Sequence, residues 1–247
     1  LIRDVSRLGK FDGIAGSLAL LRRVMPDLFT HGVIEMGDCD RYALPRIERL
    51  IESASREDVT IFEEAWGSLL GLGPGLTPAG DDLLVGFLAA HKLLSSSFGR
   101  RLGDPALRKR LTDRAERKTT PVASQFIAYA LEGMFGEILH LVFHELMFHS
   151  ALGRRPMDRD SEKPGENPIE DFLKWGHSSG TDTLAGIIFG LWTIQIGVQE
   201  KVTGTYGCSQ GGPSETYIVP EDKSMMIETR EMISSNSSAF GSAWRQM

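Results

Sequence analysis

The feature that most constrains this chain is a loop rich in glycine and proline, residues 71–82, which leads directly into an apolar stretch, residues 83–90. The loop reads Gly71-Leu72-Gly73-Pro74-Gly75-Leu76-Thr77-Pro78-Ala79-Gly80-Asp81-Asp82, with four glycines and two prolines. Glycine permits backbone conformations and close approaches that side chains forbid. Thr77 is expected to cap a helix whose first residue is Pro78. The unpaired N–H groups of such a helix start commonly hold phosphate or carboxylate, although a tight structural turn gives the same pattern.

A second copy of this motif lies 100 residues further along the chain. It reads Gly176-His177-Ser178-Ser179-Gly180-Thr181-Asp182-Thr183-Leu184-Ala185-Gly186-Ile187. Residues 180–186 match residues 80–86 at four of seven positions, and the matches include two glycines and one aspartate. The repeat favours a shared structural and functional role for the two motifs over two unrelated turns.

The spacing within each copy predicts how the two helices meet. Asp82 lies four residues before Gly86, and Asp182 lies four residues before Gly186, so each aspartate and glycine share one helix face. Small residues on such a face let two helix backbones approach closely. We therefore expect the two helices to cross at these glycines, related by a pseudo-two-fold axis, with both aspartates in one cleft. Two carboxylates in one cleft call for a cation or an amide between them.

Composition narrows the class of protein. The chain has 247 residues, 41% of them hydrophobic and 24% charged, which is typical of a globular protein with a sizeable core. A net charge of −6 without basic runs argues against binding to nucleic acid. The two cysteines, Cys39 and Cys208, indicate neither a disulfide framework nor a zinc site. The longest apolar stretch, residues 187–198, is too short for a bilayer, so we expect a cytoplasmic protein without a membrane span.

The hydrophobic periodicity predicts a mainly α fold, α+β overall, because a small β portion is possible near either end, at residues 28–36 or 217–219. We divide the chain into an N-terminal segment (1–54), a helical core with both motifs (55–198) and a polar C-terminal segment (199–247). Thr120 and Pro121 predict a third helix start that faces the same cleft. His140 and His144 have a spacing that can bind zinc, but no glutamate follows the first histidine, so hydrogen bonding is the favoured role.

The chain resembles the AllH-like family, formerly a domain of unknown function, which forms one subunit of oxamate carbamoyltransferase in bacterial allantoin degradation. The resemblance rests on residues 71–82, on Thr119-Thr120 with Ser124, and on residues 176–182. It implies phosphorolysis of oxalurate to oxamate and carbamoyl phosphate, carried out together with two partner subunits of unrelated sequence. The implied ligands are thus small anions: oxamate, oxalurate, phosphate or carbamoyl phosphate.

These arguments select the candidate site residues. We expect Asp82, Asp182 and His177 to be catalytic, with His177 as general acid or base or, equally, as a histidine that bonds the loop backbone. The expected substrate-binding residues are Gly73, Gly75, Thr77, Gly80, Asp81, Thr120, Ser124, Ser178, Ser179 and Gly180. We predict no dedicated metal site; Mg²⁺ between the aspartates is possible, but a carbamoyl NH₂ is favoured. The alternative function is a non-catalytic subunit that binds a small carboxylate or serves assembly.

Overall fold

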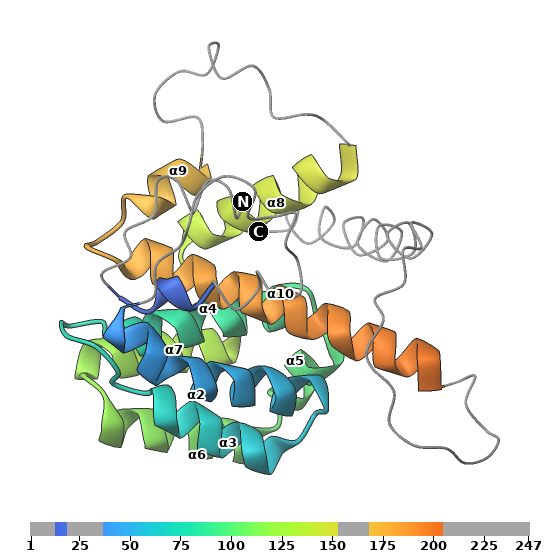
Figure 1. Ribbon diagram of the computed structural model, residues 1–247, viewed down its shortest axis with the longest axis horizontal. Helices are drawn as coiled ribbons and strands as arrows, with labels where there is room; N and C mark the ends of the chain where they lie inside the picture. The colour runs from blue at the N-terminus through green and yellow to red at the C-terminus, as the bar shows by residue number, and fades with distance from the viewer. Residues whose placement is uncertain (1–12, 19–36, 153–167, 205–247) are drawn as a thin grey trace.

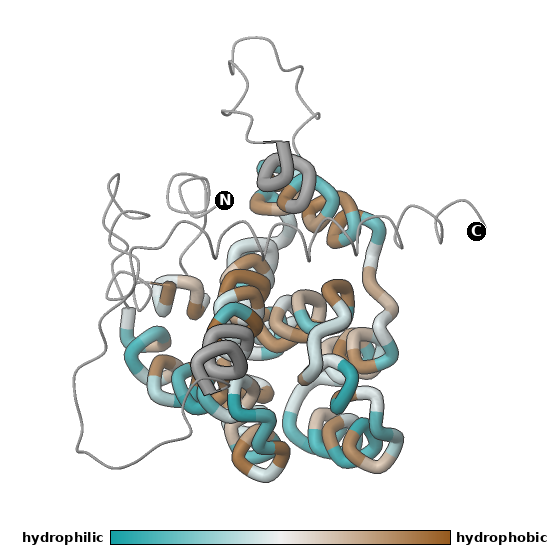
Figure 2. Tube along the Cα trace, turned by 90° about the vertical axis from the view of Figure 1, so that its right-hand side faces the viewer, coloured by the Kyte–Doolittle hydropathy of each residue, from teal (hydrophilic) through white to brown (hydrophobic). Residues whose placement is uncertain are grey.

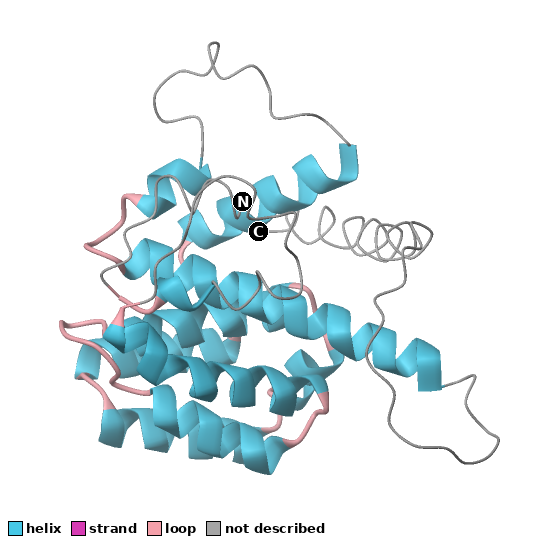
Figure 3. Ribbon diagram, viewed as in Figure 1, coloured by secondary structure: helices cyan, strands magenta, loops and turns pink. Residues whose placement is uncertain are grey.

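The computed structural model describes residues 13–18, 37–152 and 168–204, and these residues form helices joined by loops, with no strand among them (Figure 3). The predicted mainly α fold is confirmed. The possible strands at residues 28–36 and 217–219 lie outside the described residues. The proposed division of the chain into three parts stays a prediction.

Nine helices follow a short 3₁₀ turn at residues 15–18 in the described part of the chain (Figure 1). Their bounds are α2 Asp38–Ser55, α3 Val59–Leu69, α4 Ala79–Leu93, α5 Ser97–Arg101, α6 Pro105–Lys118, α7 Pro121–Glu132, α8 Glu137–Leu152, α9 Pro168–Leu173 and α10 Ser179–Gly204. The two glycine motifs therefore lead into α4 and α10.

Helices α4 and α10 pack along each other at the centre of the molecule, and the other helices surround this pair (Figure 1). Helices α2, α7 and α9 contact the pair directly, while α6 lies outside α3 and α7. Hydrophobic positions concentrate along the inner helices, and hydrophilic ones along the outer helices (Figure 2). The largest fully buried side chains include Trp66, Phe62, Phe87 and Phe189. The site motifs are thus attached to the most buried part of the fold.

Local sequence signals explain where the helices begin and end. Helix α7 starts with the Thr120 hydroxyl accepting the N–H of Ala123 at 3.1 Å, and Pro121 follows as its first residue. It ends at Gly133, whose φ of 83° is accessible to glycine at little cost. Asp104 caps α6 in the same manner, accepting the N–H of Ala106 at 2.8 Å. The predicted helix start at Thr120 is confirmed.

No single helix in the ranges that the structure describes is both long and apolar enough to cross a bilayer. The bent pair formed by Pro121–Glu132 and Glu137–Leu146 meets the criteria of length and composition only when its two parts are joined.

Candidate functional site

The crossing of α4 and α10 occurs at Gly86 and Gly186. A Cβ atom at Gly86 would overlap the carbonyl oxygen of Thr183, and one at Gly186 would overlap that of Leu83. These contacts are related by the same offset of 100 residues as the two sequence motifs. The expected close, pseudo-two-fold crossing is confirmed, and it brings the two helix starts side by side.

The helix starts meet through two hydroxyl groups. Thr77 Oγ1 lies 3.1 Å from Ser179 Oγ, so the first loop reaches directly to the start of α10. The expectation that Thr77 caps α4 is wrong. The backbone of Pro78 is extended, with ψ of 144°, so Pro78 takes the N-cap position and α4 begins at Ala79. The Thr77 hydroxyl is therefore available to the other half of the site.

Asp82 points into the region between the two helix starts. Its Oδ2 atom is buried and has no hydrogen-bond partner. Burial is the main cause that raises the pKa of Asp82 to about 7 from the usual 3.8, and the charge of Asp182 raises it further. Hydrogen bonds from Ser179 and Thr77 partly oppose this rise. Asp82 therefore changes its protonation state near neutral pH.

Asp182 is the second buried carboxylate and has no solvent-exposed surface. Its Oδ1 atom accepts the backbone N–H of Ile14 at 2.8 Å, while Oδ2 is buried without a partner. Burial raises the pKa of Asp182 to about 7, the bonds from Ile14 and Ser178 lower it, and the charge of Asp40 raises it. The two predicted aspartates thus share one electrostatic environment, and each retains one unpartnered oxygen.

Asp81 faces the body of the loop. It accepts the N–H of Gly71 at 3.0 Å and the hydroxyl of Thr119, and it is 1% exposed. Burial raises the pKa of Asp81, whereas these two bonds lower it. These two hydrogen bonds connect the beginning of the glycine loop and the end of α6 to the first turn of α4.

The glycines of the motifs fall into two groups. Gly73 and Gly75 adopt φ of 111° and 100°, and nothing lies within 4 Å of the position that a Cβ of Gly75 would occupy. Gly80 and Gly180 instead pack against preceding helices, where a Cβ would overlap the carbonyl oxygens of Leu69 and Phe172, respectively. The loop glycines therefore shape an open surface, and the helix glycines permit close packing.

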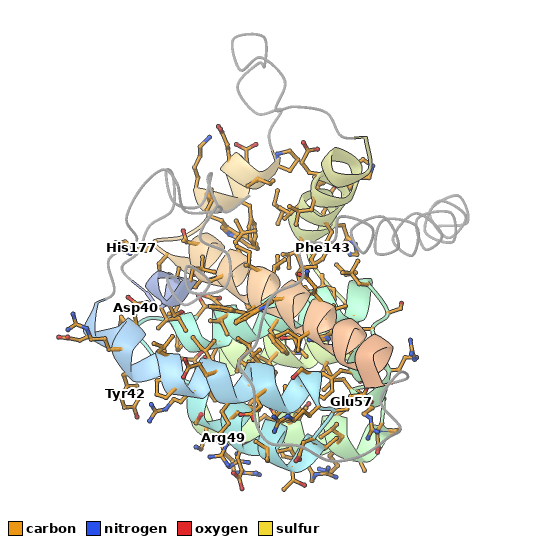
Figure 4. All side chains as sticks on the ribbon, turned by 45° about the vertical axis from the view of Figure 1, so that its right-hand side comes forward. Asp40, Tyr42, Arg49, Glu57, Phe143 and His177 are labelled. Atoms are coloured by element: carbon orange, nitrogen blue, oxygen red, sulfur yellow. The ribbon has the colours of Figure 1, made fainter. Side chains whose placement is uncertain are left out.

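The other predicted site residues are Thr120, Ser124, Ser178 and His177. Thr120 donates its hydroxyl to the carbonyl of Leu76, which attaches α7 to the glycine loop. Ser124 bonds the carbonyl of Pro121 at 3.0 Å, within its own helix. Ser178 precedes α10 and bonds Asp182. His177 is exposed at the N-terminal end of α10 (Figure 4). Thr120 and Ser124 thus bond to backbone carbonyls, and Ser178 to an aspartate.

One residue of this environment was not expected from the sequence. Asp40 is 1% exposed and accepts the N–H groups of Gly37 at 2.8 Å and Ser17 at 2.9 Å. Burial raises the pKa of Asp40, and its three backbone hydrogen bonds lower it. The only sequence signal is the spacing of Gly13 and Gly16, whose missing side chains make room for Asp182 and Asp40.

The donor set offers little for a metal ion. Within the residues that the structure describes, no group of three or more histidines, cysteines, aspartates or glutamates is arranged to hold one. Asp82 and Asp182 supply two carboxylates, with the hydroxyls of Thr77 and Ser179 beside them. The arrangement is better suited to hydrogen bonds with an amide or a hydroxyl than to a closed metal shell.

Comparison with known proteins gives a family match that includes both glycine motifs. Residues 69–191 match the family model described as oxamate carbamoyltransferase subunit AllH. The match contains the glycine loop, α4, α7, the second motif and the first half of α10. No solved structure matches the chain.

Proposed function

We propose that this chain, whose residues 69–191 belong to the oxamate carbamoyltransferase subunit AllH family, holds the carbamoyl group during its transfer between oxalurate and phosphate. The protein would act as a subunit of an oxamate carbamoyltransferase-like complex in allantoin degradation. One observation carries the proposal. Two buried carboxylate oxygens, Oδ2 of Asp82 and of Asp182, have no partner, and they lie beside two joined helix starts.

The unpartnered oxygen of Asp182 supports recognition of an amide. A buried carboxylate oxygen without a donor is costly, and a ligand that brings an N–H group removes that cost. The carbamoyl NH₂ has such N–H groups and carries no charge. We assign one of them to Asp182 Oδ2, because Oδ1 is already bonded to the N–H of Ile14.

The proton affinity of Asp82 supports acid catalysis. With a pKa of about 7, Asp82 is partly protonated at neutral pH and can donate a proton. In the proposed step, a phosphate oxygen attacks the carbamoyl carbon of oxalurate. The bond from that carbon to the oxamate nitrogen breaks, and Asp82 gives its proton to this nitrogen. Carbamoyl phosphate and oxamate result, and Asp82 is left as a carboxylate.

The helix starts supply the anion-binding part of the proposal. Helices α4 and α10 begin at Ala79 and Ser179, and each presents the positive end of its dipole there. We place the phosphate or the substrate carboxylate beside the hydroxyls of Thr77 and Ser179, which are 3.1 Å apart. This position also suits the negative charge that develops on the carbamoyl oxygen. His177 is at the exposed end of α10 and remains a second candidate acid or base.

A second candidate function is favoured by a different observation. Three large side chains of α7 are exposed on one helix face at a spacing of four and three residues: Val122, Phe126 and Tyr129, with exposed fractions of 42%, 49% and 45%. Leu76, 72% exposed, is close by because Thr120 bonds its carbonyl. Such a face suits contact with another subunit. In this alternative the chain binds a small carboxylate or assembles the complex, while a partner performs the chemistry.

One experiment separates the two functions. The purified chain is incubated with oxalurate and phosphate, release of carbamoyl phosphate is measured, and oxamate binding is followed by calorimetry. Turnover that Asp82→Asn abolishes supports the catalytic proposal, with the fully exposed Asp38→Asn as control. Oxamate binding without turnover, lost in Asp182→Asn, supports the binding subunit. If neither turnover nor binding occurs, both functions are wrong for the isolated chain.

A further inference from the structure

A buried turn near the N-terminus joins two of the carboxylates. Residues 13–18 are all buried, and Ile14 and Leu18 are part of the hydrophobic core. The N–H of Ile14 donates to Asp182 at 2.8 Å, and the N–H of Ser17 donates to Asp40 at 2.9 Å. One turn of six residues thus bonds a carboxylate of α10 and a carboxylate of α2.

The turn is shaped for both carboxylates. A Cβ at Gly13 would overlap the carboxylate of Asp182, and a Cβ at Gly16 would overlap that of Asp40. Each aspartate therefore lies against a glycine of the turn and accepts the N–H of the next residue, which is Ile14 for Asp182 and Ser17 for Asp40. A turn with side chains at these two positions cannot adopt this arrangement.

Asp40 is also hydrogen-bonded to the start of its own helix, α2. It occupies the third position of α2 and accepts the N–H of Gly37 at the start of that helix, at 2.8 Å. It therefore connects the turn to a long, rigid helix. The charge of Asp40 raises the pKa of Asp182, and the charge of Asp182 raises the pKa of Asp82.

We propose that Asp40 is a positioning residue for Asp182, acting through the turn of residues 13–18. Asp40 holds the turn in place, and the turn presents the Ile14 N–H that binds Asp182 Oδ1. Oδ2 is thereby left as the free acceptor of the site. This inference rests on the proposed function only in taking Asp182 as a site residue.

The test compares two substitutions that remove the same charge. Asp40→Asn keeps a carbonyl oxygen that can accept the Ser17 N–H, whereas Asp40→Leu has a similar shape and no acceptor. Both are made in an Asp82→Asn background, so that Asp182 titrates without its coupled neighbour. The titration of the Asp182 side-chain carbon is followed by ¹³C NMR. Because both variants lack the Asp40 charge, a difference between them reports the hydrogen bonds that residue 40 accepts from Ser17 in the turn and from Gly37 at the start of α2.

We expect the titration midpoint of Asp182 to be about one pH unit higher in Asp40→Leu than in Asp40→Asn, since loss of a hydrogen bond to the charged form raises a carboxyl pKa. Hydrogen exchange of the Ile14 N–H should accelerate at least about tenfold in Asp40→Leu relative to Asp40→Asn. Equal midpoints and equal exchange in two folded variants would overturn the proposal. Neither measurement requires turnover, so the result is independent of whether the chain transfers carbamoyl groups.

A second pair of variants applies if Asp40→Leu does not fold. Gly16→Ala places a methyl group into the carboxylate of Asp40, while the Asp40 charge is retained. Gly37→Ala is the matched control, because its methyl group would lie 3.6 Å from the same carboxylate, an ordinary contact. We expect Gly16→Ala alone to raise the Asp182 midpoint. A midpoint that stays at the wild-type value in a folded Gly16→Ala protein contradicts the positioning role.

Discussion

Gly86 and Gly186 occupy equivalent positions of two crossing helices, and each faces a backbone carbonyl of the opposite helix. Gly86→Ala should therefore destabilise the protein strongly, because the added methyl group would overlap the carbonyl of Thr183, which cannot rotate away. We expect a loss of about 1–3 kcal/mol in the free energy of unfolding, the usual cost of overpacking, or more. Denaturant titration measures it.

The control for that substitution is Gly136→Ala. Nothing lies within 4 Å of a Cβ at Gly136, and its φ is not in the left-handed region. Its free energy of unfolding should stay within about 0.5 kcal/mol of the wild-type value. If Gly86→Ala is as well tolerated as Gly136→Ala, the close crossing is incorrect.

A second prediction concerns the two aspartates as functional groups. Asp82→Asn and Asp182→Asn should each reduce turnover by at least about a hundredfold in whichever preparation is active, because a positioned acid or acceptor is removed. The melting temperature should not fall, since each substitution removes a buried charge. Kinetics and calorimetry on the same samples check both statements. Full activity in both variants would rule out the shared cleft.

The third prediction is a pH dependence of stability. Because burial raises the pKa of Asp182 from 3.8 to about 7, the native state binds this proton more tightly than the unfolded state. The resulting stabilisation is fully present below about pH 3.8 and is lost as the pH rises through about 7. The advantage of Asp182→Asn over wild type should therefore grow from about pH 4 to 8, by on the order of 4 kcal/mol. A constant difference across this range would contradict a raised pKa.

The opposite pH dependence is expected for His91. Burial lowers its pKa from 6.5 to about 3, and the ring lies between Phe87 and Phe98 with Nδ1 2.8 Å from Ser96 Oγ. The neutral ring stabilises the protein above about pH 6.5, and this contribution is lost as the pH falls toward 3. His91→Phe should therefore lose less stability than wild type between about pH 6.5 and 4. Denaturant titrations of both proteins over this pH range measure the difference, and parallel curves would contradict a buried, neutral His91.

A fifth prediction tests the open part of the loop. Gly75 has φ of 100°, which a β-branched residue adopts only at a cost of about 1–3 kcal/mol, so Gly75→Val should change the loop conformation. Its surroundings are open, and the body of the protein should remain folded. We expect at least about a tenfold loss of oxamate or phosphate affinity with native-like helix content. Unchanged affinity, measured by calorimetry, would show that the loop does not bind the ligand.

The helix crossing was predictable because it depends on a repeated local pattern. Identical residue types at an offset of 100, with a glycine four residues after each aspartate, indicate both the faces and their symmetry. The same pattern predicted that Asp82 and Asp182 would lie near one another. Helix caps such as Thr120 also depend on neighbouring residues only, and the sequence indicates them well.

The contacts that the sequence did not reveal join distant segments. The turn at residues 13–18 meets Asp182 across 168 positions of sequence, and no periodicity connects them. Thr77 was misassigned because its hydroxyl has a partner 102 residues away, which a local capping rule cannot take into account. The catalytic role of His177 stays a prediction, because a histidine in a loop gives the same sequence pattern whether it binds substrate or backbone.

The anchoring of the glycine loop by Asp81 has a consequence for how a ligand would bind. A chain with this many glycines has a large conformational entropy when it is free, and ordering it at the moment of binding would weaken affinity. Here the bonds from Gly71 and Thr119 to Asp81, and that from Thr120 to Leu76, order the loop during folding instead. The entropy loss is then part of the folding equilibrium, and a small anion would meet a receptor whose shape already exists before the encounter.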